Sequence, residues 1–203
     1  MDLGRALCAE MKVECTIVSN DWDGIIPALQ AKKFDMILSS MSITKERLEQ
    51  VDFTDKIYNT PPAIAVSKDS GIESLDDLKG KTIGAQTSTT HSNYAEVHLK
   101  DSELKLYPTS EEYKLDIESG RVDAVIDDVV VLDDWLKSDD GACCKLLQTL
   151  PTDVEINGPG VGIAVRKGDP LREKLNTTIA AVRASGEYDE IAKKYFDFDV
   201  YGD

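Results

Sequence analysis

Residues 81–99, KTIGAQTSTTHSNYAEVHL, contain the pattern on which the predicted fold depends. The first five residues favour a short buried strand, and the residues from Thr89 or Thr90 to Leu99 favour a helix. A polar run from Gln86 to His91 joins the two. A strand that leads directly into a helix is typical of an α/β protein with a parallel sheet.

The same alternation extends over nearly the whole chain. It breaks at 58–62, where two prolines cannot donate hydrogen bonds to a sheet, and again at 157–160. We therefore expect one α/β lobe made of residues 1–60 and 158–203, with a contiguous second lobe, 61–157, inserted into it. Two hinged α/β lobes of this kind bind small ligands at the carboxyl ends of their strands. Further helices are expected at 2–11, 24–32, 44–49, 111–119, 129–136, 170–184 and 188–196, and further strands at 12–18, 34–38, 63–66, 104–107, 122–126 and 161–165.

Composition and charge exclude several classes of function. The chain has 203 residues, which is long enough for one or two domains. Its hydrophobic fraction of 41% is sufficient for a buried core. Lys and Arg number 23 against 38 Asp and Glu, and the net charge of −15 repels nucleic acid and anionic lipid headgroups. No apolar run approaches the ~18 residues of a membrane-spanning helix, and the first residues do not resemble a signal peptide. We expect no nucleic-acid partner, no membrane contact and no export signal in this chain.

The four cysteines are too sparse for a disulfide scaffold. Cys8 lies in an expected helix and Cys15 in the strand after it, so a helix running back along that strand could bring the two sulfurs together. Such a bridge would indicate an oxidising compartment. Cys143 and Cys144 are adjacent, and we interpret them as two free thiols rather than a vicinal disulfide. No nearby histidine completes a zinc site around them.

Three polar clusters directly follow expected strands. The serine-rich run 39–42, with Arg47 in the next turn, offers hydroxyls, amides and a guanidinium that suit a carboxylate. The run 86–91 opens a helix, whose free N–H groups favour an anion. The pair 127–128 offers two carboxylates that suit an ammonium. Together the clusters outline a site for an α-amino acid, although each could also be an ordinary helix start with solvated side chains.

Five stretches resemble the bacterial periplasmic amino-acid-binding proteins of ABC importers, in particular the lysine/arginine/ornithine- and histidine-binding branch. They are WDGIIPAL (22–29), DMILSSMSIT (35–44) followed by Arg47, LKGKTIG (78–84), GRVDA (120–124) and KKYFD (193–197). The resemblance covers essentially the whole chain and implies a type II periplasmic-binding-protein fold with two hinged lobes. It further implies a periplasmic receptor without cofactor, metal or enzymatic activity, which delivers an amino acid to the membrane subunits of an ABC permease.

The resemblance also implies roles for particular residues. Arg47 matches the arginine that holds the ligand α-carboxylate, helped by the amides of Ser42 and Thr90. Asp128 matches the acid that receives the α-ammonium, with Ser40 and Ser42 assisting. The implied ligand is arginine, lysine, ornithine or histidine. The other implied contacts are Trp22, whose ring would face the aliphatic or cationic part of the ligand, Ser39, Gln86, Thr89 and His91; Cys8 and Cys15 match a disulfide of this branch.

The start of the chain departs from the family, whose members carry a signal peptide, a first strand and a ligand-capping loop ahead of the helix expected at 2–11. We therefore expect an N-terminally truncated first lobe, weakened ligand binding and a homodimer formed through the incomplete sheet.

Three other functions stay open. An opine receptor is one, because the sequence WDG at 22–24 resembles that branch too. A cyclohexadienyl or arogenate dehydratase is another, in which Asp127 or His91 would serve as the acid. A dimeric remnant that binds no ligand is the third. His91 and His98, seven residues apart on one helix, are expected to face solvent rather than to bind a metal.

Overall fold

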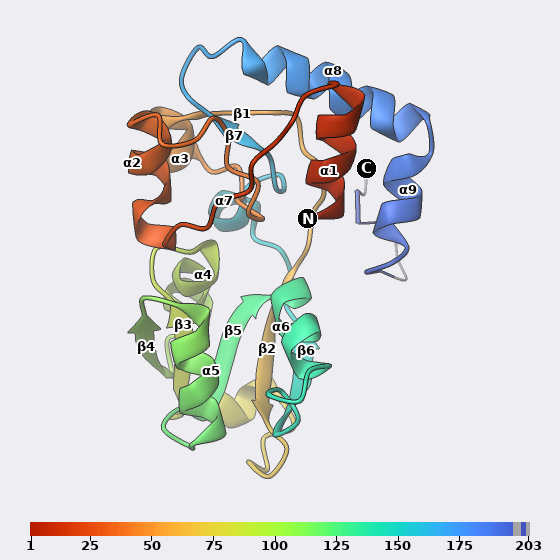
Figure 1. Cartoon of the computed structure of the whole chain (residues 1–203). Helices are drawn as coiled ribbons and strands as arrows, with labels where there is room; N and C mark the ends of the chain where they lie inside the picture. Colours follow the sequence, from red (N-terminus) through yellow and green to blue (C-terminus); the bar gives the residue numbers. More distant parts are fainter. Residues whose placement is uncertain (197–199, 202–203) are drawn as a thin grey trace. The chain divides into compact units, whose positions relative to one another are not determined.

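A computed structural model describes residues 1–196, 200 and 201 of the chain. The chain divides into two units: an outer unit, Met1–Asn59 with Gly158–Asp203, and an inner unit, Thr60–Asn157 (Figure 1). No helix among the described residues is long and apolar enough to cross a membrane. The stretch KKYFD at 193–197 ends in Asp197, which lies outside the described residues.

The inner unit is built on a five-stranded sheet in the order β4-β3-β5-β2-β6 (Figure 1). Strand β3 runs parallel to β4 and to β5, whereas β2 runs antiparallel to β5 and to β6. Its elements are β2 (Pro62–Ser67), η2 (Leu75–Leu78), β3 (Thr82–Gln86), α4 (Thr90–His98), β4 (Glu103–Tyr107), α5 (Ser110–Glu118), β5 (Ala124–Asp128), α6 (Val129–Leu136), β6 (Cys144–Thr149) and α7 (Val154–Asn157).

Helices cover both faces of this sheet, because successive side chains of a strand point to opposite sides. On one face Ile64 of β2 is buried with Tyr94 of α4. On the other face Ala65 of β2 is buried with Tyr113 of α5 and Trp135 of α6. All of β2 from Pro62 to Val66 is buried, which explains why its sequence is a continuous apolar run.

The outer unit has few strands and many helices. Strands β1 (Asp52–Phe53) and β7 (Ala164–Val165) form an antiparallel pair. Isolated bridges join Ile37 to Ala164 of β7, and Ser42 and Tyr58 to Val161. The helices are α1 (Asp2–Glu10), η1 (Trp22–Gly24), α2 (Ile25–Gln30), α3 (Lys45–Gln50), α8 (Leu171–Ala184) and α9 (Glu187–Ala192). One buried cluster joins α1, α8 and α9, and a second lies around α2 and β1.

Several expected strands of the outer unit do not form as predicted. Residues 12–18 contain no strand, and Val13, Ile17 and Val18 are exposed. The strand expected at 34–38 is reduced to a bridge at Ile37, and the one expected at 161–165 is reduced to β7. The physical reason is that β-branched residues favour a strand only where a neighbouring strand offers a ladder, and no described strand pairs with 12–18.

In the inner unit the differences are smaller. The strand expected at 122–126 begins two residues later and runs on through Asp128, because Asp127 and Asp128 pair with Ala63 and Pro62 of β2. Strand β6 was not expected at all. It pairs with β2 and continues the sheet, which the mixed sequence CKLLQT did not indicate.

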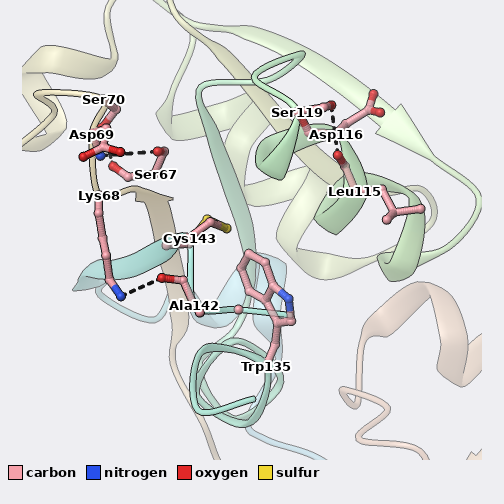
Figure 2. Close-up of a disulfide and its surroundings, with 12 residues drawn as sticks. Ser67, Lys68, Asp69, Ser70, Leu115, Asp116, Ser119, Trp135, Ala142 and Cys143 are labelled. Carbon is pink, nitrogen blue, oxygen red and sulfur yellow. Dashed lines mark hydrogen bonds between the residues drawn. A yellow bond between two sulfur atoms is a disulfide. The ribbon is translucent and has the colours of Figure 1, made fainter. Parts of the chain in front are cut away.

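Both cysteine pairs form disulfides. The Cys8–Cys15 bridge is present, as the resemblance implied. Cys143 and Cys144 are also joined, so the interpretation as free thiols is wrong (Figure 2). Cys144 is buried at the start of β6 in the same cluster as Trp135, and the amide of Lys68 donates to the Cys143 carbonyl at 3.0 Å. The side chain of Lys68 adds a 2.7 Å bond to the Ala142 carbonyl, so Lys68, directly after β2, holds this turn through both its backbone and its side chain.

Candidate functional site

In the outer unit, the site begins with Arg47 in the first turn of α3. Thr44 caps this helix, because its Oγ1 accepts a hydrogen bond from the Arg47 amide at 3.2 Å. The Arg47 guanidinium donates through Nη1 to the Ser42 carbonyl at 3.0 Å and lies 5.3 Å from the centroid of the Trp22 ring. Burial lowers the pKa of Arg47 to about 10, so the side chain remains cationic at neutral pH.

The serines that precede α3 have different environments. Ser39 and Ser40 are exposed, and the Ser40 hydroxyl shares a 2.6 Å hydrogen bond with the Tyr58 hydroxyl. Ser40 has a φ of 52°, a left-handed conformation that turns the chain sharply between two extended segments. Ser42 is half-buried and its backbone bridges to Val161. The outer unit therefore brings Trp22, Ser42 and Arg47 together, while Ser40 is paired with a tyrosine that the sequence did not single out.

In the inner unit, the run 86–91 lies where β3 ends and α4 begins. Gln86 donates through Nε2 to the Pro108 carbonyl at 3.0 Å, which ties its amide to the loop after β4. Thr89 is the N-cap of α4: its Oγ1 accepts from the Ser92 amide at 3.1 Å and donates to the Gln86 carbonyl at 2.8 Å. Thr90 follows as the first helical residue and is buried. The partial positive charge at the start of this helix suits an anion.

Asp127 and Asp128 end β5, the parallel neighbour of β3, so both strands finish at the same edge of the sheet. Asp128 accepts hydrogen bonds from the Thr60 hydroxyl and, at 2.8 Å, from the Val130 amide, which makes it the N-cap of α6. Burial raises the pKa of Asp128, and the charge that His91 can carry acts against this effect.

His91 contacts this acidic pair from α4. Its Nδ1 lies 3.2 Å from Oδ1 of Asp127, and its side chain is 15% exposed, so the expectation that His91 faces solvent is wrong. His98 is 40% exposed and pairs instead with Asp153, with 2.8 Å between Nε2 and Oδ2. Across the described residues no group of three or more His, Cys, Asp or Glu side chains is arranged to hold a metal ion.

Sequence reasoning missed two residues of this acidic cluster, Thr60 and Tyr113. Thr60 donates to Asp128, and Tyr113 donates to Asp127 at 2.5 Å. Neither residue belongs to a motif. Thr60 precedes two prolines, and Tyr113 lies in a stretch whose pattern indicates only an amphipathic helix. Only the register of β2 against β5, and the packing of α5 on the sheet, brings them to the acids.

An α/β chain that crosses twice between two units, with polar side chains gathered at strand ends in each, defines a solute-binding protein of the type II periplasmic-binding-protein fold. The family model of the bacterial extracellular solute-binding proteins, family 3, matches residues 1–198, and the chain belongs to this family. The fold class and the family resemblance predicted from the sequence are confirmed.

Named relatives agree with this assignment. The chain is 46% identical to the L-arginine-binding protein of Pseudomonas aeruginosa, with 100% of this chain and 80% of the relative covered. It is 40% identical to the histidine-binding periplasmic protein of Escherichia coli, with the same coverage. Among solved structures, a Salmonella typhimurium periplasmic binding protein described as having high arginine specificity matches with a TM-score of 0.87, 31% identity, and coverage of 96% of this chain and 87% of that one. All three are described as binding proteins.

Proposed function

We propose that this chain is a receptor for a cationic L-amino acid of the arginine, lysine, ornithine or histidine class, and that it delivers this ligand to an ABC permease. The observation that carries the proposal is a separation of charge. The outer unit holds a half-buried guanidinium, Arg47, in the first turn of α3, and the inner unit holds two buried carboxylates, Asp127 and Asp128, at the end of β5. An α-amino acid carries the two complementary charges.

The carboxylate of the ligand is assigned to Arg47. The Ser42 carbonyl and the Trp22 ring restrict this side chain before any ligand arrives, and the Thr44 cap holds the backbone amide of Arg47. A guanidinium presents its N–H donors in a fixed plane that matches the two oxygens of a carboxylate. Holding the group in advance lowers the entropy that ligand binding costs.

The ammonium of the ligand is assigned to Asp128. Thr60 and Val130 each donate one neutral hydrogen bond to this carboxylate, and the capacity of two carboxylate oxygens exceeds two bonds. A buried carboxylate without a cation is unstable, which is why burial raises its pKa. A ligand ammonium would supply the missing positive charge. Gln86, Thr89, Thr90, Ser39, Ser40 and Ser42 belong to the proposed site as secondary contacts.

The proposal extends to location and partners. The relatives described as periplasmic support a periplasmic receptor, and the Cys8–Cys15 disulfide fits an oxidising compartment. Self-association through the outer unit remains part of the proposal, since Val13, Ile17 and Val18 are exposed on a segment without regular secondary structure. Size-exclusion chromatography with light scattering decides this point, because a monomer at all concentrations would exclude a stable dimer.

Calorimetric titration tests the receptor function. We expect heat of binding with L-arginine, L-lysine, L-ornithine or L-histidine, and weaker or no binding with L-glutamate and with octopine. Arg47→Met and Asp128→Asn should each weaken binding about 10- to 150-fold, the effect of losing a hydrogen bond to a charged group worth about 1.5–3 kcal/mol. Arg5→Met and Asp76→Asn are matched controls, because both side chains are exposed and each forms an ion pair with a residue three positions away.

Two results would overturn the proposal. One is wild-type protein that binds none of these amino acids, and the other is Arg47→Met protein that keeps both its melting temperature and its affinity.

A further inference from the structure

At the end of β5, two buried carboxylates stand side by side, and only one of them has a role in the proposed receptor. Asp127 is 7% exposed and Asp128 is 6% exposed. Asp127 uses both oxygens: Oδ2 accepts from the Tyr113 hydroxyl at 2.5 Å, and Oδ1 accepts from the Asp128 amide at 2.7 Å. Burying a carboxylate costs free energy even when both of its oxygens accept hydrogen bonds. A function that offsets this cost lies with the groups that Asp127 faces.

The group that Asp127 faces is His91. The Nδ1 atom of His91 is buried, lies 3.2 Å from Oδ1 of Asp127, and has no aligned hydrogen bond with any described residue. The contact with Asp127 is therefore a close polar contact rather than an aligned hydrogen bond. Since α4 carries His91 and β5 carries Asp127, the contact also joins the start of the helix to the end of the strand.

We propose that Asp127, held by Tyr113, is a positioning residue that fixes the ring of His91 through Nδ1, and that His91 held in this way selects ligands whose side chains carry N–H donors. This inference rests on the proposed receptor function. Asp127 and Tyr113 would influence ligand selection through His91, without contacting the ligand themselves.

The chemistry of imidazole leads from position to selectivity. When the proton of a neutral ring lies on Nδ1, facing a carboxylate, Nε2 is left as a hydrogen-bond acceptor. An acceptor suits a guanidinium, an ammonium or an amide N–H, and disfavours a side-chain carboxylate. The negative charge of Asp127 beside that of Asp128 adds to the preference for a cationic ligand.

Tyr113 is suited to hold Asp127 because its own position is fixed by packing. Its side chain is fully buried, and its ring meets the ring of Tyr107 edge to face, with centroids 6.5 Å apart. Burial raises the pKa of Tyr113 well above its ordinary value, so the hydroxyl stays protonated and donates at any physiological pH. Tyr113→Phe therefore removes the donor and leaves the ring in place.

The first experiment needs no ligand. The chain has 2 histidines, so ¹⁵N NMR of the ring nitrogens gives two sets of signals, which His98→Gln assigns. We expect Nδ1 of His91 to be the protonated nitrogen in wild-type protein. Asp127→Asn should shift the His91 signals toward the Nε2–H tautomer, Tyr113→Phe should shift them less in the same direction, and His98 should not move. Unchanged His91 signals in folded Asp127→Asn protein would overturn the positioning role.

The second experiment measures selectivity. We expect the ratio of Kd for L-methionine, whose side chain has no N–H donor, to Kd for L-arginine to fall about tenfold in Asp127→Asn and in His91→Gln. The double variant should show no further fall, because both changes remove the same interaction. Asp153→Asn is the matched control, since Asp153 pairs with the other histidine of α4. Equal weakening of both ligands, or additive effects of the two changes, would contradict the inference.

The two experiments separate this inference from the receptor function. If wild-type protein binds neither amino acid, the receptor function and the selectivity step both fail, and the NMR comparison alone decides whether Asp127 positions His91.

Discussion

Asp116 collects three donors on a single buried carboxylate. Arg121 Nε donates at 2.6 Å, the Tyr107 hydroxyl at 2.5 Å and Lys105 Nζ at 2.9 Å. The hydrogen bond from Arg121, followed by those from Tyr107 and Lys105, holds the pKa of Asp116 well below its ordinary value. These bonds tie α5 to β4 and to the turn that leads into β5, so the inner unit depends on this carboxylate being ionised.

The sign of the pH effect follows from the lowered pKa of Asp116. A carboxyl whose pKa is lower in the folded state stabilises the fold above the unfolded value of about 3.9, and this contribution is lost as the pH falls through the folded pKa. We expect the melting temperature of wild-type protein to drop below about pH 4 more steeply than that of Asp116→Asn. Asp76→Asn, at an exposed pair, is the control. Parallel curves for wild type and Asp116→Asn in thermal melts at pH 2.5–5 would contradict this.

At the scale of single residues, sequence reasoning found the groups whose chemistry is visible in their type and spacing. Arg47 follows a serine-rich strand end, and Asp128 ends another strand, so both could be singled out. Tyr113 and Thr60 could not be singled out, because their hydroxyls matter only once the fold places them beside the carboxylates of Asp127 and Asp128. His91 was singled out by resemblance, but its contact with Asp127 depends on two strands ending at the same edge.

Among the elements, α3 is a short helix that depends on its cap. Thr44 accepts from the Arg47 amide, whereas Thr109, the N-cap residue of α5, makes no side-chain cap bond. Thr44→Ala should cost about 1 kcal/mol of the free energy of unfolding, and lower the melting temperature by ~2–4 °C. Because Arg47 lies in the first turn, the affinity for the amino acid should fall too. Thr109→Ala should change neither quantity, and a similar loss in both variants on calorimetry would disprove the capping role.

The turn at Gly158 requires glycine for two reasons. Its φ is +71°, and a Cβ there would collide with the backbone carbonyl of Ile43. Gly168 has a similar φ of +69° but nothing within 4 Å of an added Cβ. Gly168→Ala should cost about 1–2 kcal/mol from backbone conformation alone. Gly158→Ala should cost at least ~1 kcal/mol more, because the Ile43 segment must also move. Urea unfolding of the two variants measures the difference, and equal costs would show that the collision is relieved without strain.

Most helices and four of the five inner-unit strands were predictable because their signals are local. Caps such as Thr44 and Thr89, and the apolar run of β2, lie within a few residues of the element that they define. The failures depend on pairing. Residues 12–18 have the composition of a strand but no described partner, and β6 has a weak strand sequence but a strong partner in β2. A strand is a property of two segments, and one segment alone does not reveal it.

For the molecule as a whole, each unit has its own buried clusters. Two clusters lie entirely within 60–157, one on each face of the five-stranded sheet. We expect a fragment of residues 60–157 to fold alone, with a cooperative thermal transition and dispersed NMR signals. Residues 1–59 should not fold alone, because α1 shares its core with α8 and α9 from the other end of the chain. A fragment 60–157 without a cooperative transition would show that the inner unit needs the outer one.

At both crossings, neighbouring residues are fastened to different units. The Asn59 amide donates to the Val200 carbonyl in the outer unit at 2.7 Å, while the next residue, Thr60, donates to Asp128 in the inner unit. On the return, Asn157 accepts from the Asp153 amide at 3.0 Å, and Gly158 lies against Ile43. Each junction is thus a single peptide bond between two anchors. These two peptide bonds are therefore natural splice points for a chimera. An inner unit taken from a homologue and joined there would keep the contacts of residues 60 and 157, and the outer unit of this chain would keep those of residues 59 and 158.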